Sequence, residues 1–282
     1  MTDRHALVLG GGGVAGIAWM TGLLAGLADA GDDLTGADIL IGTSAGAAVA
    51  AQVGSGLALD ELFGRQAEPE RQSDEIAANV DLAKFAEEIA AYLAGAATPA
   101  DALRRIGTYA LEAQTVPESA RLAAIASRLP SQDWPAREIR LVAVDAETGE
   151  MRVFDARSGV QLVDAVAASC AVPGIWPPVT IDGRRYVDGG IRSSDNADLA
   201  AGAERITIIS PIGYNSALPS ALPLRDVVAT LREAGSAVTV LTPDAASVVA
   251  MGANPLDPAT RTPAARAGRA QGVAGLAANA AP

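Results

Sequence analysis

Ser44 lies in the pentapeptide GTSAG (residues 42–46), a pattern typical of a nucleophilic serine on a sharp turn between a strand and a helix. The flanking sequence fits that context. An apolar run at 39–41 predicts a strand, and an Ala- and Val-rich run at 45–53 predicts a helix. The positive end of that helix dipole would stabilise a developing negative charge. Ser44 is therefore the candidate nucleophile.

A serine nucleophile needs a base, and the chain contains a single histidine, His5. His5 precedes a predicted strand at 6–9, whereas Ser44 follows one. We therefore expect His5 at the opposite edge of the sheet, as a solvated residue near the N-terminus. The base is then expected to be a carboxylate, a lysine, or a water held by one of them.

Asp188 is the best carboxylate candidate. It closes the segment RRYVDGG (184–190), in which strands at 179–181 and 185–187 flank an Asp-Gly turn and form a predicted hairpin. A short, stiff side chain at a strand end suits a base, although Asp-Gly is also an ordinary turn sequence. An aspartate has an ordinary pKa of about 3.9 and is a weak base at neutral pH. We therefore predict a partly apolar pocket around Asp188.

Four consecutive glycines, residues 10–13, follow the first strand and precede an apolar helix. Bare backbone amides in such a loop can donate to an oxyanion or a phosphate. Gly11, Gly13 and Gly16 also satisfy the dinucleotide-binding pattern G-x-G-x-x-G, which expects an acidic residue at the end of the next strand. Here that strand ends in Gly-Thr-Ser at 42–44. Both alternatives remain open on this loop alone.

Taken in order, three segments resemble the patatin-like phospholipases, which are lipid acyl hydrolases with a Ser-Asp dyad. They are the glycine loop GGGVAG (11–16), the elbow GTSAG and the DGG at 188–190, and a fourth stretch, ASCAVPGIWPPV (168–179), is similar to the family's approach to the aspartate hairpin. The resemblance implies that Ser44 is the nucleophile and Asp188 the base. It also implies that the backbone amides of the loop form the oxyanion hole, which involves Gly11, Gly12 and Gly13.

The implied reaction is acyl transfer through an acyl-enzyme, with a lipid or small acyl ester as substrate and no cofactor. Where the family often carries Arg or Lys in the glycine loop, this chain has Ala15. That departure favours the alternative of a non-catalytic regulatory protein that keeps the fold. A dinucleotide-binding oxidoreductase is the second alternative. The sequence leaves open which ester is cleaved, whether the acceptor is water or an alcohol, and the oligomeric state.

Composition restricts the partners. The formal net charge of −12 argues against nucleic acid and allows at most transient contact with a membrane surface. The single cysteine, Cys170, is expected to be a buried packing thiol, and the sequence offers no Cys or His cluster for a metal. Asp3 and the missing basic segment around it argue against a signal peptide, so we expect a cytoplasmic protein.

Alternating strands and helices predict an α/β fold with three layers, α/β/α, around a mainly parallel sheet. We expect one domain over 1–282. Residues 57–135 have no convincing strand and are expected to form a helical insertion, which is either a lid or acyl-chain wall above the site or a layer that covers the sheet. At 255–282 we expect a helical tail whose Arg261, Arg266 and Arg269 form a solvated basic face.

Overall fold

One mixed sheet forms the centre of the computed structural model, which describes residues 4–78, 80, 82–214 and 222–279. Among these residues, eight strands join in the order β5-β6-β3-β2-β1-β7-β8, with β4 paired to β3. Neighbours within the segment β3-β2-β1-β7-β8 are parallel, and β4, β5 and β6 are antiparallel. The strand bounds are β1 His5–Leu9, β2 Ile39–Thr43, β3 Glu138–Asp145, β4 Met151–Phe154, β5 Val179–Ile181, β6 Arg184–Asp188, β7 Arg205–Ile209 and β8 Ala237–Leu241.

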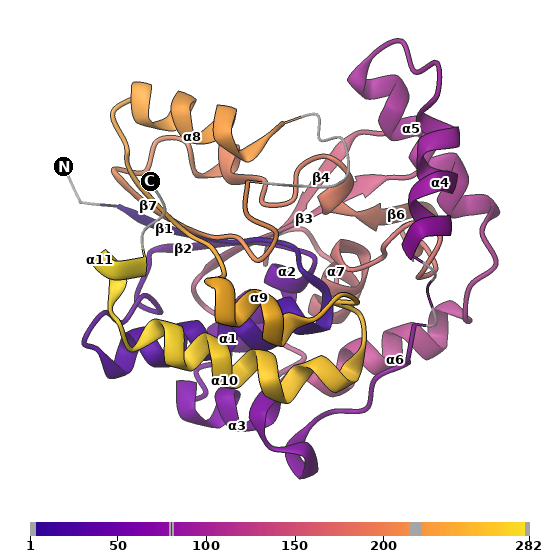
Figure 1. Ribbon diagram of the computed structural model, residues 1–282. Coiled ribbons are helices and arrows are strands. Elements are labelled where there is room, and N and C mark those ends of the chain that lie inside the picture. The colour runs from indigo at the N-terminus through magenta and orange to yellow at the C-terminus, as the bar shows by residue number, and fades with distance from the viewer. Residues whose placement is uncertain (1–3, 79, 81, 215–221, 280–282) are drawn as a thin grey trace.

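Helices cover both faces of this sheet (Figure 1). The main helices on one face are α1 (Gly13–Asp29), α2 (Ala45–Gly54), α3 (Leu59–Ala67) and α10 (Arg261–Gly272), and α8 (Leu224–Glu233) with a short 3-10 turn at Ala197–Ala200 covers the other. The two largest clusters of the core accordingly lie one on each face of the sheet. The predicted three-layer α/β/α fold with a mainly parallel sheet is confirmed.

The register of the parallel strands brings the glycine loop and the Ser44 turn to the same edge of the sheet. Leu9 at the end of β1 pairs with Gly42 near the end of β2, so the glycine loop and the Ser44 turn leave the sheet side by side. His5 lies at the start of β1, about 13 Å away along the strand. The expectation that His5 is solvated is wrong, because its side chain is buried and its Nε2 lies 3.0 Å from the Thr207 hydroxyl.

Helix α10 packs closely along α1. Glycines on both helices permit the approach, because a Cβ at Gly268 would lie 2.2 Å from the Trp19 carbonyl oxygen and one at Gly22 would lie 2.1 Å from that of Ala265. This helix therefore forms part of a helix layer of the fold.

The expected solvated basic face on this helix is also wrong. Arg261 is buried near Glu75, and the guanidinium of Arg269 pairs with Asp29 and Asp60. Only Arg266 of the three is exposed. Docking of α10 against α1 and the segments around residues 60–75 places the other two against carboxylates that lie far away in sequence.

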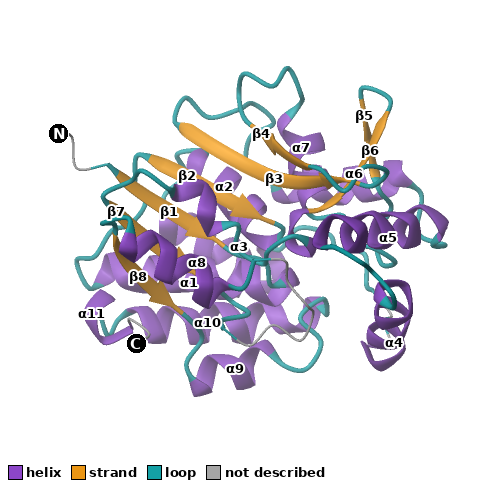
Figure 2. Cartoon of the chain, turned by 90° about the horizontal axis from the view of Figure 1, so that it is seen from above, coloured by secondary structure: helices purple, strands orange, loops and turns teal. Residues whose placement is uncertain are grey.

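The described residues of 57–135 contain helices and no strand, as predicted. Besides α3, these helices are α4 (Leu82–Leu93), α5 (Pro99–Glu112) and α6 (Glu118–Arg128), with a 3-10 turn at Pro69–Arg71. The Thr98 hydroxyl caps α5 by accepting the Asp101 amide at 3.1 Å. Figure 2 shows α5 beside the end of the sheet formed by β5 and β6, with α4 farther from these strands. Within this stretch α3 packs on α1, α4 packs on α5, and α6 packs on α7 (Leu162–Ser169).

The remaining helices are short. They are α7 (Leu162–Ser169), α9 (Ala245–Met251) and α11 (Leu276–Asn279), with further 3-10 turns at Gly189–Ile191 and Pro258–Thr260. In the part of the chain that the structure describes, no helix has both the length and the apolar character needed to cross a bilayer.

Candidate functional site

Ser44 sits on a strained turn between β2 and α2. Its backbone angles, φ 55° and ψ −116°, lie in a region that a non-glycine residue rarely adopts. The turn requires glycines on both sides, because a Cβ at Gly46 would lie 1.8 Å from the Leu9 carbonyl oxygen and one at Gly42 would lie 2.6 Å from that of Gly46. The half-buried Ser44 faces a cavity from the N-terminus of α2. This is the geometry that the GTSAG pattern predicts.

The backbone of Ser44 is held by two residues at the end of α7. The Ser169 hydroxyl accepts the Ser44 amide at 3.0 Å and donates to the Val142 carbonyl at 2.7 Å. The Cys170 thiol donates to the Ser44 carbonyl at 3.1 Å. Burial raises the pKa of Cys170 to about 12, so the thiol stays protonated. The expectation of a buried Cys170 is confirmed, and the support that Ser169 gives to the turn was not predicted.

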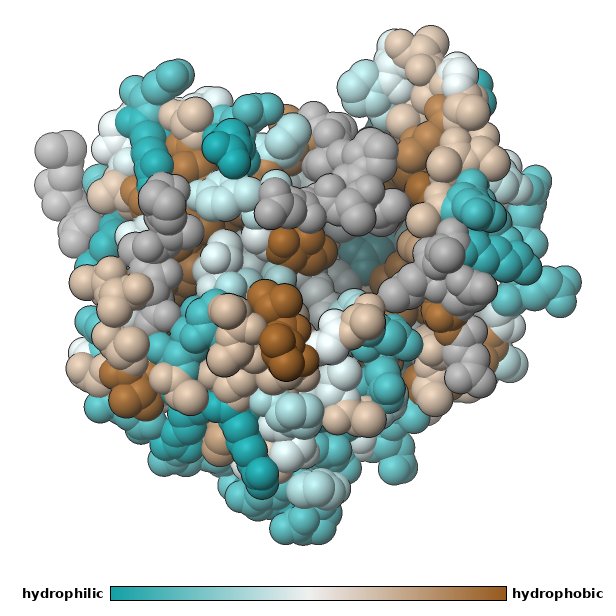
Figure 3. Space-filling model, viewed as in Figure 1, coloured by the Kyte–Doolittle hydropathy of each residue, from teal (hydrophilic) through white to brown (hydrophobic). Residues whose placement is uncertain are grey.

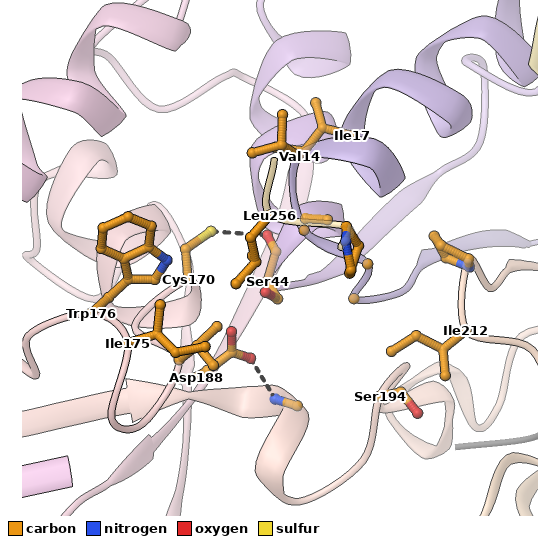
Figure 4. Close-up of a pocket in the computed structure, with 18 of the residues that line it drawn as sticks. Val14, Ile17, Ser44, Cys170, Ile175, Trp176, Asp188, Ser194, Ile212 and Leu256 are labelled. Atoms are coloured by element: carbon orange, nitrogen blue, oxygen red, sulfur yellow. Dashed lines mark hydrogen bonds between the residues drawn. The ribbon is translucent and has the colours of Figure 1, made fainter. Parts of the chain in front are cut away.

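Asp188 ends β6 beside Ser44 and is 4% exposed (Figure 4). Its Oδ1 accepts the Gly190 amide at 2.7 Å. Burial raises the pKa of Asp188 to about 6, although a hydrogen bond with the Ser44 side chain, the Gly190 amide and the charge of Arg121 each lower it. The structure therefore places Asp188 in the apolar surroundings predicted for it. A carboxylate with this pKa can accept a proton near neutral pH.

The glycine loop offers two of its three predicted donors. Gly11 donates its amide to the Ser194 carbonyl at 2.8 Å, so this amide is occupied and the expectation for Gly11 needs correction. The amides of Gly12 and Gly13 have no acceptor among the described residues, and both residues line the cavity. The Ala45 amide, next to Ser44, has none there either. The donors available to a ligand are therefore Gly12, Gly13 and Ala45.

Asn196 ties the nucleophile strand to the Asp188 turn. Its buried side-chain amide donates to the Thr43 hydroxyl at 3.0 Å and to the Gly189 carbonyl at 3.2 Å. The residue adopts a left-handed conformation, with φ 47°. No sequence motif predicted a role for Asn196. Two signals were available in the sequence. Asn196 follows the DGG segment closely, and asparagine tolerates the left-handed backbone angles that a tight turn requires.

A cavity of about 440 Å³ opens in front of Ser44, within the range usual for small-molecule sites. Its walls are mostly apolar, and they include residues of α4 and α9 and of the loop that follows α7, namely Phe85, Ile89, Leu93, Val172, Ile175 and Met251. In Figure 3 the surface is hollowed beside a group of hydrophobic residues. The apolar walls suit an acyl chain.

The described residues provide no group of three or more His, Cys, Asp and Glu side chains that could hold a metal. Dinucleotide binding through the glycine loop would require an acidic residue where β2 ends. Thr43 and then Ser44 occupy that place.

One family model agrees with this geometry. A family model described as patatin-like phospholipase matches residues 7–201, a span that contains the glycine loop, Ser44 and Asp188. Among solved structures, VipD from Legionella pneumophila is similar, with 13% identity, a TM-score of 0.48, and coverage of 99% of this chain and 68% of that one. The type III effector protein ExoU has 16% identity and a TM-score of 0.40, with 95% and 53% of the two chains covered.

Proposed function

Because this chain belongs to the patatin-like phospholipase family, we propose that it cleaves acyl esters of lipids through a Ser44–Asp188 dyad and an acyl-enzyme. Family membership makes the chain a lipid ester hydrolase. The dyad, the oxyanion hole and the phospholipase A or carboxylesterase type of substrate are the proposal. The observation that carries it is the strained turn that places Ser44 beside Asp188. This buried carboxylate has a pKa of about 6 and lies at the wall of an apolar cavity.

In the proposed first step, Asp188 accepts the hydroxyl proton while Ser44 Oγ attacks the ester carbonyl. The carbonyl oxygen becomes an oxyanion and accepts hydrogen bonds from the Gly12 and Gly13 amides. Each such donor is worth roughly 3 kcal/mol in other enzymes. The C–O bond then breaks, the leaving alcohol takes the proton from Asp188, and the acyl group remains on Ser44. Ala15 supplies no cation here, so neutral amides stabilise the oxyanion from this loop.

In the second step, a water gives its proton to Asp188 and attacks the acyl-enzyme. The tetrahedral intermediate collapses, Ser44 recovers its proton from Asp188, and the carboxylic acid leaves. The Gly190 amide holds Oδ1 of Asp188 at 2.7 Å, which fixes the direction of the carboxylate in both steps. An alcohol in place of water would give acyl transfer by the same route. We further propose that α4, whose Phe85, Ile89 and Leu93 line the cavity, acts as an acyl-chain wall or lid.

The decisive experiment compares matched pairs of variants on p-nitrophenyl butyrate and on a panel of phospholipids and glycerides. Ser44→Ala should lose activity by about 10⁴-fold or more, and Ser55→Ala, at the other end of α2, should keep it. Asp188→Asn should lose about 10²- to 10⁴-fold, and Asp182→Asn, in the turn of the same hairpin, should keep it. Wild-type rates in Asp188→Asn would reject the dyad.

A fluorophosphonate probe separates this proposal from a non-catalytic role. The probe should label the wild type at Ser44 and fail to label a folded Ser44→Ala variant, because only an activated serine reacts. Failure to label a well-folded wild type would support the regulatory alternative. Saturable binding of NAD(P) would instead support the dinucleotide alternative.

A further inference from the structure

Three arginines gather around one buried carboxylate at the side of the cavity. Nη1 of Arg121 lies 2.7 Å from Glu75 Oε1, Arg128 pairs with Oε2, and Nη2 of Arg261 lies 3.9 Å from Oε2. All four side chains are between 2% and 5% exposed. The cluster therefore holds three positive charges and one negative charge away from water.

The three arginines also have hydrogen-bond donors that are not used within the cluster. Nε of each arginine is buried without a hydrogen-bond partner among the described residues. Arg261 directs its other nitrogens to the backbone and hydroxyl of Ser73. Burial lowers the pKa of Arg121 and of Arg261, and the neighbouring charge of Arg128 adds to that effect. A buried cation without a counter-ion is costly, so an anion that entered the site would be stabilised.

Two members of the cluster face the same space as Ser44. Arg121 and Arg128 line the cavity, whereas Arg261 is not among the described residues that line it. The two lie seven positions apart on α6 and so share one face of the helix. The Arg121 guanidinium stacks 3.8 Å from the centre of the Trp176 ring, which fixes its plane at the cavity wall. Its charge acts on both Asp188 and Cys170, so it lies close to the nucleophile turn.

We propose that Arg121 and Arg128 form a subsite that binds the phosphate group of the substrate. A phosphate diester carries a negative charge on two free oxygens, and arginine donates to such oxygens in pairs. The cation that Ala15 does not supply would thus come from α6 instead of the glycine loop. This subsite rests on the proposed ester hydrolysis at Ser44 and narrows the substrate to phosphate-bearing acyl esters.

Binding tests the subsite without catalysis. In the Ser44→Ala chain, calorimetry should detect dodecylphosphocholine, and Arg121→Gln should weaken that binding by about tenfold or more. Dodecyl maltoside, which has the same alkyl chain and no phosphate, should be unaffected by Arg121→Gln. Arg261→Gln is the matched control because it removes a guanidinium from the same carboxylate outside the cavity. Equal weakening by Arg261→Gln, or no measurable binding of either dodecylphosphocholine or inorganic phosphate, would overturn the proposal.

Inorganic phosphate identifies the source of the anion. If it binds with the same dependence on Arg121 and dodecylphosphocholine does not, the subsite takes a small phosphate compound. If dodecylphosphocholine binds more tightly, the subsite takes a lipid headgroup. Should Arg121→Gln fail to fold, Arg121→Lys replaces it, because lysine keeps the charge toward Glu75 and loses the paired donors. Unchanged dodecylphosphocholine affinity in Arg121→Lys would also overturn the subsite.

Kinetics provide the second readout. Arg121→Gln should lower kcat/KM for dihexanoyl phosphatidylcholine by about tenfold or more, and that for p-nitrophenyl hexanoate by less than about threefold. A parallel fall on both esters would mean that Arg121 acts through Asp188 or through folding, and would overturn the subsite. If the wild type hydrolyses neither ester, the proposed function fails, while the binding measurements still decide the fate of the subsite.

Discussion

Two aspartates seven positions apart in the chain, Asp188 and Asp195, are both buried near the nucleophile turn and the glycine loop, but they have different partners. Asp188 accepts the Gly190 amide, meets the Ser44 hydroxyl and is within the field of Arg121. Neither carboxylate oxygen of Asp195 has a hydrogen-bond partner among the described residues. The comparison indicates that Asp188 is suited to exchange a proton with Ser44, whereas Asp195 is only buried.

The pKa values follow this difference. Burial raises the pKa of both groups, to about 6 for Asp188 and to about 7 for Asp195, where the nearby hydroxyls of Ser210 and Ser194 offset burial only in part. At neutral pH, Asp188 is therefore mostly ionised and Asp195 is about half protonated. Burial alone does not make a base, because a base also needs donors that stabilise its ionised form.

The largest effect should come from Asp195→Asn, which removes the enclosed charge. The folded state keeps the Asp195 proton to a higher pH than the unfolded chain, so the wild type loses stability as pH rises from about 4 to about 7. The variant should therefore gain up to about 4 kcal/mol in the free energy of unfolding at pH 8, and less at pH 5. Urea unfolding at the two pH values measures this gain.

Asp182→Asn, at the hairpin turn, controls for the substitution itself. An equal gain at pH 5 and pH 8 would contradict the role of titration. The same change at Asp188 should give a smaller gain at pH 8, because the pKa of that group is raised less.

Gly10→Ala should have the next largest effect, because the new Cβ would lie 2.1 Å from Asp195 Oδ1. Crowding of this kind costs about 1–3 kcal/mol in the free energy of unfolding. Gly36→Ala is the control, since no atom lies within 4 Å of the corresponding Cβ. Thermal unfolding measures both.

Combining Gly10→Ala with Asp195→Ala locates the strain. The double variant should recover most of the cost of Gly10→Ala, because the carboxylate that the Cβ meets is gone. Strictly additive costs would show that the loop, rather than Asp195, resists the added methyl group.

The smallest effect concerns pH and activity. If Asp188 must be ionised to accept the Ser44 proton, kcat/KM should rise about tenfold per pH unit below about pH 6 and level off above it. In Arg121→Gln the midpoint should move to higher pH, since the positive charge of Arg121 lowers the pKa of Asp188. A rate that falls above pH 6 would mean that the protonated carboxyl is the active form.

Much of the site could be predicted because its parts are local. GTSAG specifies a strand, a tight turn and a helix through small residues at set positions, and the turn has the strained angles expected for Ser44. The hairpin that presents Asp188 is set by an Asp-Gly turn between short strands. Parallel pairing of β2 with β3 and antiparallel pairing of β6 with β3 then bring Ser44 and Asp188 to the same part of the sheet.

Other features depend on segments far apart in the chain. Whether the Gly11 amide is free depends on the carbonyl of Ser194, and the burial of His5 depends on Thr207. Arg261 was expected on a solvated face, but docking of α10 against α1 carries it to Glu75. No local pattern reports such contacts, because they form only when the layers close.

The sequence by itself determined the fold class, the nucleophile turn and the candidate base. These depend on the spacing of glycines within short motifs and on the alternation of strands and helices along the chain. The tertiary structure decided the environment of each charge. It placed three arginines around one carboxylate beside the cavity. It gave Asp188 the Gly190 amide and the charge of Arg121, whereas serine hydroxyls are the groups that offset burial at Asp195. The physical reason is that desolvation and pairing depend on what surrounds a group in space, and neighbours in space come from distant parts of the chain.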